Sequence, residues 1–398
     1  MSDILSIFGA SETEQAHNPY RVLGYPRNPF RAPAGDLQEG NIPLYEGHIR
    51  DQLQQIDHWL GDVYQRQVRD PLSVVGGIGT GKTHLLRLMR QRLDATGPQQ
   101  RVAADLLMLG DAGYSRASIG QLLVLALERL RLPWVRSVEG VFPLIWGIVS
   151  QEHFPAPPPF PGRLTPVLQR IHEAAPSDKQ RRAQLVTSWL QHAQLSDAEA
   201  RLIGLPRRID WEGELVPVVA ELFTLGRAAG VLDTFFLLID QIEELFRPVF
   251  SELRRSRLLT DLRGLVDYID SGAPIGLVLA WTPDFHHPVP LERPGEVEQA
   301  FRQKYEALFG RLQRRRLNLP LLASEHAEPF ARRWIDSLKG QEGFEPDAQP
   351  NPTEVVRTAW QHLRKTRQLY PGEKVTPRDL LAALAEEIER RVTGRGAS

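Results

Sequence analysis

The sequence contains no cysteine, which excludes a disulfide framework and any zinc site built from thiolates. It also lacks a long apolar run: the densest stretches, Phe235–Ile239 and Ile275–Trp281, fall far short of the ~18 residues of a membrane-spanning helix. The first residues show no basic segment followed by an apolar run, so no signal peptide is predicted. We therefore expect a cytoplasmic protein with no membrane partner.

Net charge is nearly absent as well. The formal charge is −1, so no global basic field indicates DNA binding, and the local cluster Arg311–Arg316 is the candidate contact if DNA is a partner. With 398 residues, and at about 150 residues per domain, the length predicts two or three domains.

Lysine is scarce among the basic residues, and Lys82 is the only lysine in the first 178 residues. It lies in a glycine-rich segment that matches the pattern G-x-x-x-x-G-K-S/T. The apolar run Leu72–Val75 precedes the segment and predicts a strand, and a helical apolar stripe from Leu85 to Leu93 follows it. Strand, glycine-rich loop and helix form the setting of a phosphate-binding P-loop.

The residue types of this loop suit a nucleotide. Glycines let the backbone approach phosphates, and the N–H groups of the loop and the helix start face the anion. Lys82 supplies a compact positive charge to the β- and γ-phosphates of ATP, and the Thr83 hydroxyl can bind Mg²⁺. The predicted nucleotide-binding residues of the loop are Gly76, Gly77, Ile78, Gly79, Thr80, Gly81, Lys82, Thr83 and His84.

A second acidic motif follows the apolar run Thr234–Asp240. Its five consecutive apolar residues predict a strand buried on both faces. Asp240 ends this strand, where ligands bind in open α/β sheets, and we interpret it as the carboxylate on the Mg²⁺ side. We expect this strand to lie beside the P-loop strand. The alternative is that Asp240 only caps a helix starting near Ile242.

With these two motifs, the sequence resembles the AAA+ and STAND superfamilies of P-loop ATPases. Many AAA+ proteins carry Asp-Glu at the second motif, whereas this chain has Gln241 after Asp240. The segment Asp-Gln-x-Glu-Glu is similar to that of some bacterial STAND ATPases, so Glu243 or Glu244 is the implied catalytic carboxylate. Glu243 is preferred; the alternative is that both glutamates are solvated helix charges.

The resemblance implies roles for three further polar residues. Thr282 follows the apolar strand Ile275–Trp281 and matches a γ-phosphate sensor, or else belongs to an ordinary strand-end turn. Arg311 matches an arginine finger that acts on a neighbouring subunit, or else belongs to a solvated basic turn. Arg378 matches a second sensor at the start of a lid helix, or else is a surface arginine.

The segment before the P-loop is a candidate adenine site. Leu44-Tyr-Glu-Gly-His48 is similar to a degraded form of a motif that cradles adenine in origin-recognition-type AAA+ proteins. This likeness makes Tyr45 and His48 candidates for contact with the base. The alternative, slightly preferred, is a simple N-terminal wrap over the core.

Together these patterns predict an α/β fold: a P-loop NTPase with a mainly parallel sheet flanked by helices, a C-terminal helical lid and a helical insertion. The insertion carries six prolines within residues 151–166, which predicts an extended segment, and three helices follow it. The predicted domains are the wrap (1–50), the ATPase core (51–130 and 213–320), the insertion (131–212) and the lid (321–398).

Two functions from different classes fit these features. One is a slow ATPase acting as a nucleotide-dependent switch or assembly factor, with ATP and Mg²⁺, that forms a homo-oligomer or binds a partner protein. The resemblance to prokaryotic origin-recognition-like ATPases of mobile elements points to a DNA transaction or antiviral defence. The alternative is a nucleotide-gated scaffold that hydrolyses little ATP and recruits a partner, which Gln241 favours because glutamine has no basic carboxylate.

Overall fold

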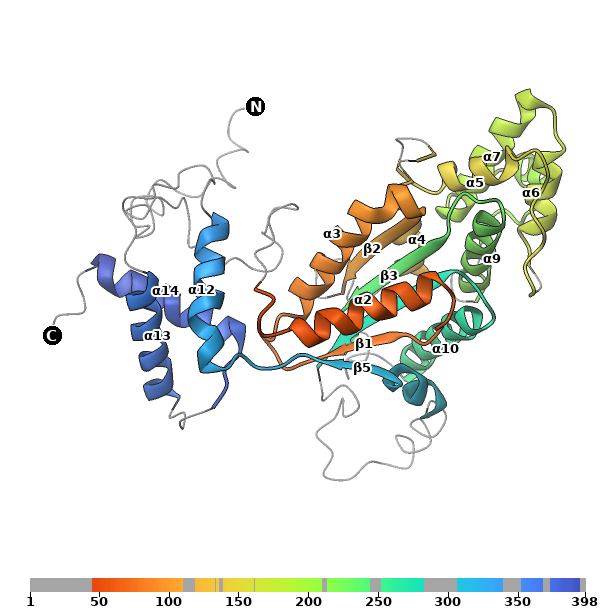
Figure 1. Cartoon of the computed structure of the whole chain (residues 1–398). Helices are drawn as coiled ribbons and strands as arrows, with labels where there is room; N and C mark the ends of the chain where they lie inside the picture. Colours follow the sequence, from red (N-terminus) through yellow and green to blue (C-terminus); the bar gives the residue numbers. More distant parts are fainter. Residues whose placement is uncertain are drawn as a thin grey trace, which may run out of the picture. The chain divides into compact units, whose positions relative to one another are not determined.

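A computed structural model describes residues 45–109, 119–132, 134–135, 139–160, 162–209, 213–243, 252–282, 306–338, 352–367 and 373–393. Its contacts divide the chain into two compact units (Figure 1). The sheet unit comprises residues 54–77 and 85–318, and the helical unit comprises the residues up to 53, residues 78–84 and residues from 319 onward. Most of the predicted N-terminal wrap, together with Glu244, lies outside the described residues.

The sheet unit is built on five strands: β1 (Leu72–Val75), β2 (Val102–Met108), β3 (Thr234–Asp240), β4 (Ile275–Trp281) and β5 (Arg315–Asn318). Their order is β2-β3-β4-β1-β5, and every pairing is parallel. The predicted α/β fold with a parallel sheet is therefore confirmed.

One expectation about this sheet is wrong: β3 does not lie beside the P-loop strand. β4 separates them, pairing with β1 through Leu72 and Val278 and with β3 through Ile275 and Phe235. The local apolar pattern identifies a buried strand but carries no information on its neighbours, which long-range packing decides.

Helices cover both faces of the sheet, and two adjacent phenylalanines show this. Side chains alternate between faces along a strand. Phe236 packs edge-on against Trp59 of α2 (Arg50–Tyr64) at 6.0 Å between ring centroids, whereas Phe235 stacks on Phe223 of α9 (Leu215–Ala228) at 4.7 Å. This two-sided burial explains why β3 and β4 are apolar along their whole length.

The remaining helices of the sheet unit outside the insertion divide between these two faces. An ion pair of 3.5 Å between Arg92 and Asp57 joins α3 (Lys82–Gln100) to α2. On the α9 face, α4 (Ile119–Glu128) and α10 (Glu252–Asp270) share a continuous apolar cluster with the sheet.

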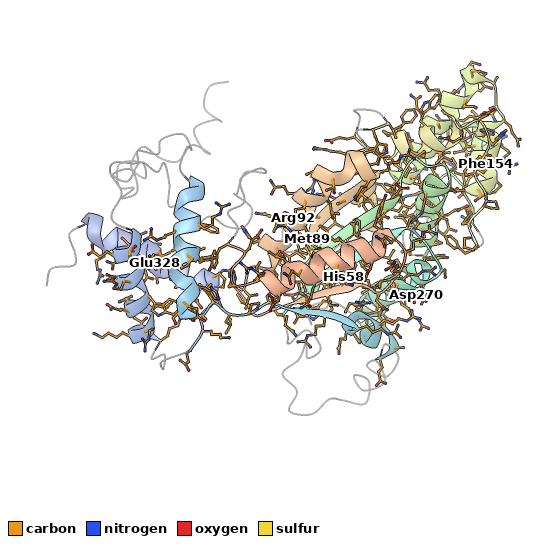
Figure 2. The ribbon with its side chains drawn as sticks, viewed as in Figure 1. His58, Met89, Arg92, Phe154, Asp270 and Glu328 are labelled. Carbon is orange, nitrogen blue, oxygen red and sulfur yellow. The ribbon has the colours of Figure 1, made fainter. Side chains whose placement is uncertain are left out.

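The insertion belongs to that same apolar cluster. It contains α5 (Phe142–Val149), α6 (Thr165–His172), α7 (Pro176–Leu190) and α8 (Asp197–Ile203), which lie around the far end of α9 in Figure 1. Residues 154–158 of the proline-rich segment are neither helical nor in a strand, as predicted. Phe154, labelled in Figure 2, packs against His172 of α6 at 5.8 Å between ring centroids.

A buried carboxylate anchors the insertion to the core. The N-cap residue of α6, Leu164, offers no side-chain cap. Glu221 of α9, which is fully buried, accepts hydrogen bonds instead from the backbone N–H of Leu164 (2.8 Å) and from the N–H and hydroxyl of Thr165 (both 2.6 Å). A negative charge at a helix N-terminus is favourable, so Glu221 of α9 acts as the N-terminal cap of α6.

The helical unit has an apolar core of its own. Its helices are α12 (Ser324–Leu338), α13 (Pro352–Thr366) and α14 (Pro377–Thr393), which fall within residues 321–398, where the sequence predicts a helical segment. Thr376 is the N-cap residue of α14: its hydroxyl accepts a hydrogen bond of 3.1 Å from the N–H of Asp379. Among the described residues, no helix is both long and apolar enough to span a bilayer.

Candidate nucleotide site

Three of the predicted residues meet at the carboxyl edge of the sheet. Because all strands are parallel, their carboxyl ends share one edge: Gly76 follows β1, Asp240 ends β3 and Thr282 follows β4. The N–H of Gly76 donates a 3.3 Å hydrogen bond to the carbonyl of Trp281, the residue before Thr282. The first loop glycine and the candidate sensor are thus joined through the backbone.

The loop after β1 has the backbone expected of a phosphate cradle. Gly79 and Gly81 have positive φ angles of 81° and 96°, which L-residues with side chains rarely adopt. Lys82 opens α3 and is 8% exposed, Thr80 is also buried, and Ile78 at the loop tip is 73% exposed. A Cβ at Gly81 would meet no atom within 4 Å, so the space beside this glycine is open to a ligand.

Asp240 is fully buried, and the chain turns sharply after it. Its Oδ1 accepts a hydrogen bond of 2.9 Å from the N–H of Gln241, and its carbonyl accepts one of 3.3 Å from the N–H of Leu109. Gln241 has a φ of +57°, in the left-handed region. Glu243 is half-buried in the short 3₁₀ turn that follows.

Within the helical unit, the start of α14 lies against the loop. The N–H of Arg378 donates to the carbonyl of Gly79 at 3.3 Å, and a Cβ added to Gly79 would come within 2.8 Å of the Arg378 Cβ. The Arg378 side chain is exposed. Arg378, at the start of α14, therefore lies next to Gly79 of the loop that follows β1.

Tyr45 and His48 pack against aromatic side chains of α12, which belongs to the same unit. Their rings are nearly parallel, 7° apart and 5.8 Å between centroids. A 3.1 Å hydrogen bond joins the Tyr45 hydroxyl to Nδ1 of His326, and His48 packs edge-on against Phe330 at 6.0 Å. Burial lowers the pKa of His48, which favours a neutral imidazole.

Sequence reasoning missed the α12 side of this aromatic group. His326, Phe330 and Trp334 are spaced four residues apart, so they follow one face of α12. Trp334 also lies 6.0 Å from the ring of His84, the residue after the P-loop threonine. The spacing is visible in the sequence and could have identified this aromatic face.

Arg311 lies at the opposite edge of the sheet. It belongs to a helical segment, residues 306–313, that leads into the start of β5, and the first residue of β5 pairs with Leu72, the first of β1. Its guanidinium binds Asp267, and also Asp270 at 3.5 Å; the hydrogen bond to Asp267 raises the arginine pKa. Since β1 rises about 10 Å over its length, Arg311 lies near the opposite end of β1 from Gly76 of its own chain.

A parallel sheet of this order, a P-loop after β1, a buried aspartate ending β3 and a separate helical unit after β5 are now in place. This arrangement is an α/β P-loop fold, as the sequence motifs predict. Within the described residues, no group of three or more histidine, aspartate and glutamate side chains forms a metal site made of protein alone.

Comparisons with known proteins give weak likenesses. No family model and no curated protein match the sequence. The structure of C. elegans PCH-2 matches over 89% of this chain and 72% of its own, with 12% identity and a TM-score of 0.37. The Aeropyrum pernix ORC2 protein, in its ADPNP–ADP complexes, matches over 87% and 70%, with 11% identity and a TM-score of 0.37.

A third solved structure, the E. coli MS115-1 HORMA:CdnC:Trip13 complex, matches over 84% of this chain and 87% of the matched one, with 13% identity and a TM-score of 0.31. Since all three TM-scores lie below 0.5, these likenesses assign neither a function nor a partner to the chain.

Proposed function

We propose that the chain is an ATP-binding, AAA+/STAND-like ATPase that acts as a nucleotide-dependent switch or assembly factor, in a prokaryotic DNA-transaction or defence system. The observation that carries ATP binding is the loop between β1 and α3. It combines two left-handed glycines, open space at Gly81 and the buried Lys82 at a helix N-terminus. The biological setting rests on the sequence resemblance.

The residues that would hold the nucleotide have the chemistry it requires. Loop N–H groups and Lys82 would neutralise the β- and γ-phosphates. The Thr83 hydroxyl and the Asp240 carboxylate are oxygen donors of the kind that Mg²⁺ prefers, and Asp240 is already oriented by the backbone N–H of Gln241. When bound, Mg²⁺ would supply positive charge to the γ-phosphate.

The remaining predicted residues would act around this centre. Thr282, tied to Gly76 through Trp281, would sense the γ-phosphate, and Arg378 would reach it from the helix start that already touches Gly79. Tyr45 and the neutral His48 would contact the adenine ring through their flat faces. Glu243, or Glu244, would accept the proton of the attacking water.

A binding and turnover experiment tests the proposal. We expect a fluorescent ATP analogue to bind in Mg²⁺ and to be displaced by ATP, with weaker displacement when EDTA removes the metal. Phosphate release, measured with and without double-stranded DNA, then distinguishes an ATPase switch from a nucleotide-gated scaffold. Absence of saturable ATP binding at millimolar concentration would refute the proposal.

A second candidate, the nucleotide-gated scaffold, is favoured by the proline-rich segment. Phe154 packs on His172, and Phe160 packs edge-on against Tyr268 at 5.0 Å, so both ends of the segment are anchored. Ala156, Pro157 and Pro159 between them are exposed. Extended proline-rich segments dock into aromatic grooves of other proteins. ATP binding without phosphate release, with or without DNA, would favour this function.

A further inference from the structure

The first turn of α14 finds one of its hydrogen-bond acceptors outside the helix. Backbone N–H groups at the start of a helix have no acceptor within the helix itself. Those of Asp379 and Leu380 donate to Thr376, the first to its hydroxyl at 3.1 Å and the second to its carbonyl at 3.2 Å. The N–H of Arg378 donates instead to the carbonyl of Gly79 at 3.3 Å. The loop after β1 therefore completes the N-terminal capping of α14.

The contact between this turn and Gly79 is close. A Cβ at Gly79 would lie 2.8 Å from the Cβ of Arg378 and 3.1 Å from the hydroxyl oxygen of Thr376. The loop residue and the turn both belong to the helical unit. Because no space separates them, a shift in the first turn of α14 must also move the Gly79 carbonyl, or break the hydrogen bond to it.

A bidentate ion pair ties the same turn to the end of α13. Nη1 and Nη2 of Arg367, the residue after α13, donate to Oδ2 and Oδ1 of Asp379 at 3.0 and 2.6 Å. Oδ2 of Asp379 also accepts the N–H of Thr376 at 3.4 Å. One carboxylate therefore joins the end of α13 to the N-cap residue of α14, two positions before the N–H that binds Gly79.

The ion pair adds orientation more than stability. α13 and α14 already share a buried apolar core, to which Leu363, Leu380 and Leu384 belong. The side chain of Arg367 is 54% exposed and that of Asp379 is 17% exposed, and ion pairs near the surface contribute little to stability. A two-point contact between a guanidinium and a carboxylate does fix a geometry, which apolar packing alone does not.

We propose that Arg367 and Asp379 are positioning residues for ATP. Their ion pair holds the first turn of α14 on Gly79 and so places the side chain of Arg378, which the proposed function assigns to the γ-phosphate. The inference rests on that proposed function. Since ADP has no γ-phosphate, the ion pair acts on ATP and much less on ADP. It thus sets the preference between the two nucleotides on which a nucleotide-dependent switch relies.

Two substitutions break the pair in different ways. Arg367→Ala removes the guanidinium, whereas Asp379→Asn removes the negative charge and keeps an oxygen that can accept the N–H of the cap residue. Arg332→Ala is the matched control, because Arg332 is 50% exposed and pairs with Glu328 at 2.8 Å in the same unit. Each variant is compared with the parent for melting temperature and for the dissociation constants of ADP and a non-hydrolysable ATP analogue.

We expect Arg367→Ala and Asp379→Asn each to weaken binding of the ATP analogue about 5- to 20-fold and binding of ADP less than about 2-fold. Their melting temperatures should stay within about 3 °C of the parent. The double variant should bind no more weakly than either single variant, because both remove one pair. When Arg378→Ala is already present, Arg367→Ala should have no further effect. Arg332→Ala should bind both nucleotides as the parent does.

Equal weakening of ATP-analogue and ADP binding would overturn the inference, because the pair would then only support the helical unit. Parental affinity in Arg367→Ala, or a further loss from Arg367→Ala when Arg378→Ala is present, would overturn it too. A parent that binds both nucleotides equally well would refute this inference alone, whereas a parent that binds no ATP would refute the proposed function itself. If Asp379→Asn does not fold, Arg367→Ala with and without Arg378→Ala carries the same comparison, since both keep the cap of α14.

Discussion

At the amino edge of the sheet the charged side chains neutralise one another, whereas at the carboxyl edge the polar groups are held by the backbone. Arg311 binds Asp267 and Arg314 binds Asp70, all four between 30% and 61% exposed. At the other edge Asp240 is fully buried and is oriented by the N–H of Gln241. Figure 2 labels Asp270, which also pairs with Arg311 on the amino side.

This difference distinguishes charged groups that only form surface ion pairs from polar groups that are suited to binding and chemistry. Half-exposed ion pairs contribute about 0.2–1 kcal/mol each and can be replaced cheaply. A buried carboxylate fixed by an adjacent amide costs more to keep and is worth keeping where it binds a cation or a substrate. Substitutions at the carboxyl edge should therefore change binding and rate, and substitutions at the amino edge should change little within a single chain.

The largest effect is expected at Lys82. Lys82→Ala should weaken ATP binding about 100-fold or more, because the phosphates lose their buried counter-charge. Lys365→Ala, an exposed lysine near the end of α13, is the matched control and should bind as the parent does. Equilibrium titration with a labelled ATP analogue measures both, and equal affinity of Lys82→Ala and the parent would remove the loop from the site.

The next largest effect is expected on stability, from a buried carboxylate in the middle of β2. Asp105 in β2 is 1% exposed, and burial raises its pKa from 3.8 to about 6 despite a 2.8 Å ion pair with Arg129. A raised acid pKa means that ionisation is harder in the folded than in the unfolded chain. This aspartate should therefore lower the free energy of unfolding as pH rises from about 4 to about 6.

The Asp105→Asn variant tests that sign. The stability of the variant relative to the parent should increase across this pH range by an amount on the order of 2 kcal/mol, measured by urea unfolding. Glu152→Gln, at an exposed position of the insertion, should show no such change. A difference that is flat with pH would mean that Arg129 compensates for burial.

A substitution at Glu243 should separate ATP hydrolysis from ATP binding at the carboxyl edge. Glu243→Gln should reduce turnover about 10- to 100-fold while ATP binding is retained, since a general base contributes to rate and not to affinity. Phosphate release under saturating ATP measures the first and analogue titration the second. Fast turnover that survives Glu243→Gln and Glu244→Gln together would show that the water is activated by another group.

The smallest effect concerns Arg311, which could act only on a neighbouring chain. ATP should promote self-association, and Arg311→Ala should weaken it about 10-fold if this arginine meets the neighbour's γ-phosphate. Arg314→Ala, at the same edge, is the control. Light scattering with ADP or a non-hydrolysable ATP analogue gives the mass. A monomer under both conditions would leave Arg311 as the partner of Asp267 and favour the scaffold function.

Much of the fold was predictable because the signals are local. The uninterrupted apolar runs of β3 and β4 gave the bounds that the structure has, and a helical segment was predicted over residues 321–398, where α12, α13 and α14 lie. The helix α5 escaped prediction because FPLIWGIV is almost wholly apolar and shows no periodicity. The neighbours of β3 escaped because pairing of parallel strands depends on contacts distant in sequence.

The candidate site also has features that the sequence predicts and features that only the folded structure reveals. The P-loop and Asp240 are recognisable from residue types at fixed spacing. The left-handed backbone of Gln241 and the binding of Arg311 to Asp267 are not, since one is a dihedral angle and the other joins residues 44 positions apart. The roles of Thr282, Arg311, Arg378, Tyr45 and His48 stay predictions.

The hydrogen bonds of Glu221 have a consequence for how the molecule opens. Separating α6 from α9 would leave a buried carboxylate without three donors, and Gly162 could not carry a side chain there, since its Cβ would overlap the same carboxylate. The amides of α6 and α9 should therefore exchange with deuterium in one cooperative step. Because α9 leads directly into β3, a ligand that slows exchange in the insertion should slow it in the strand that ends at Asp240.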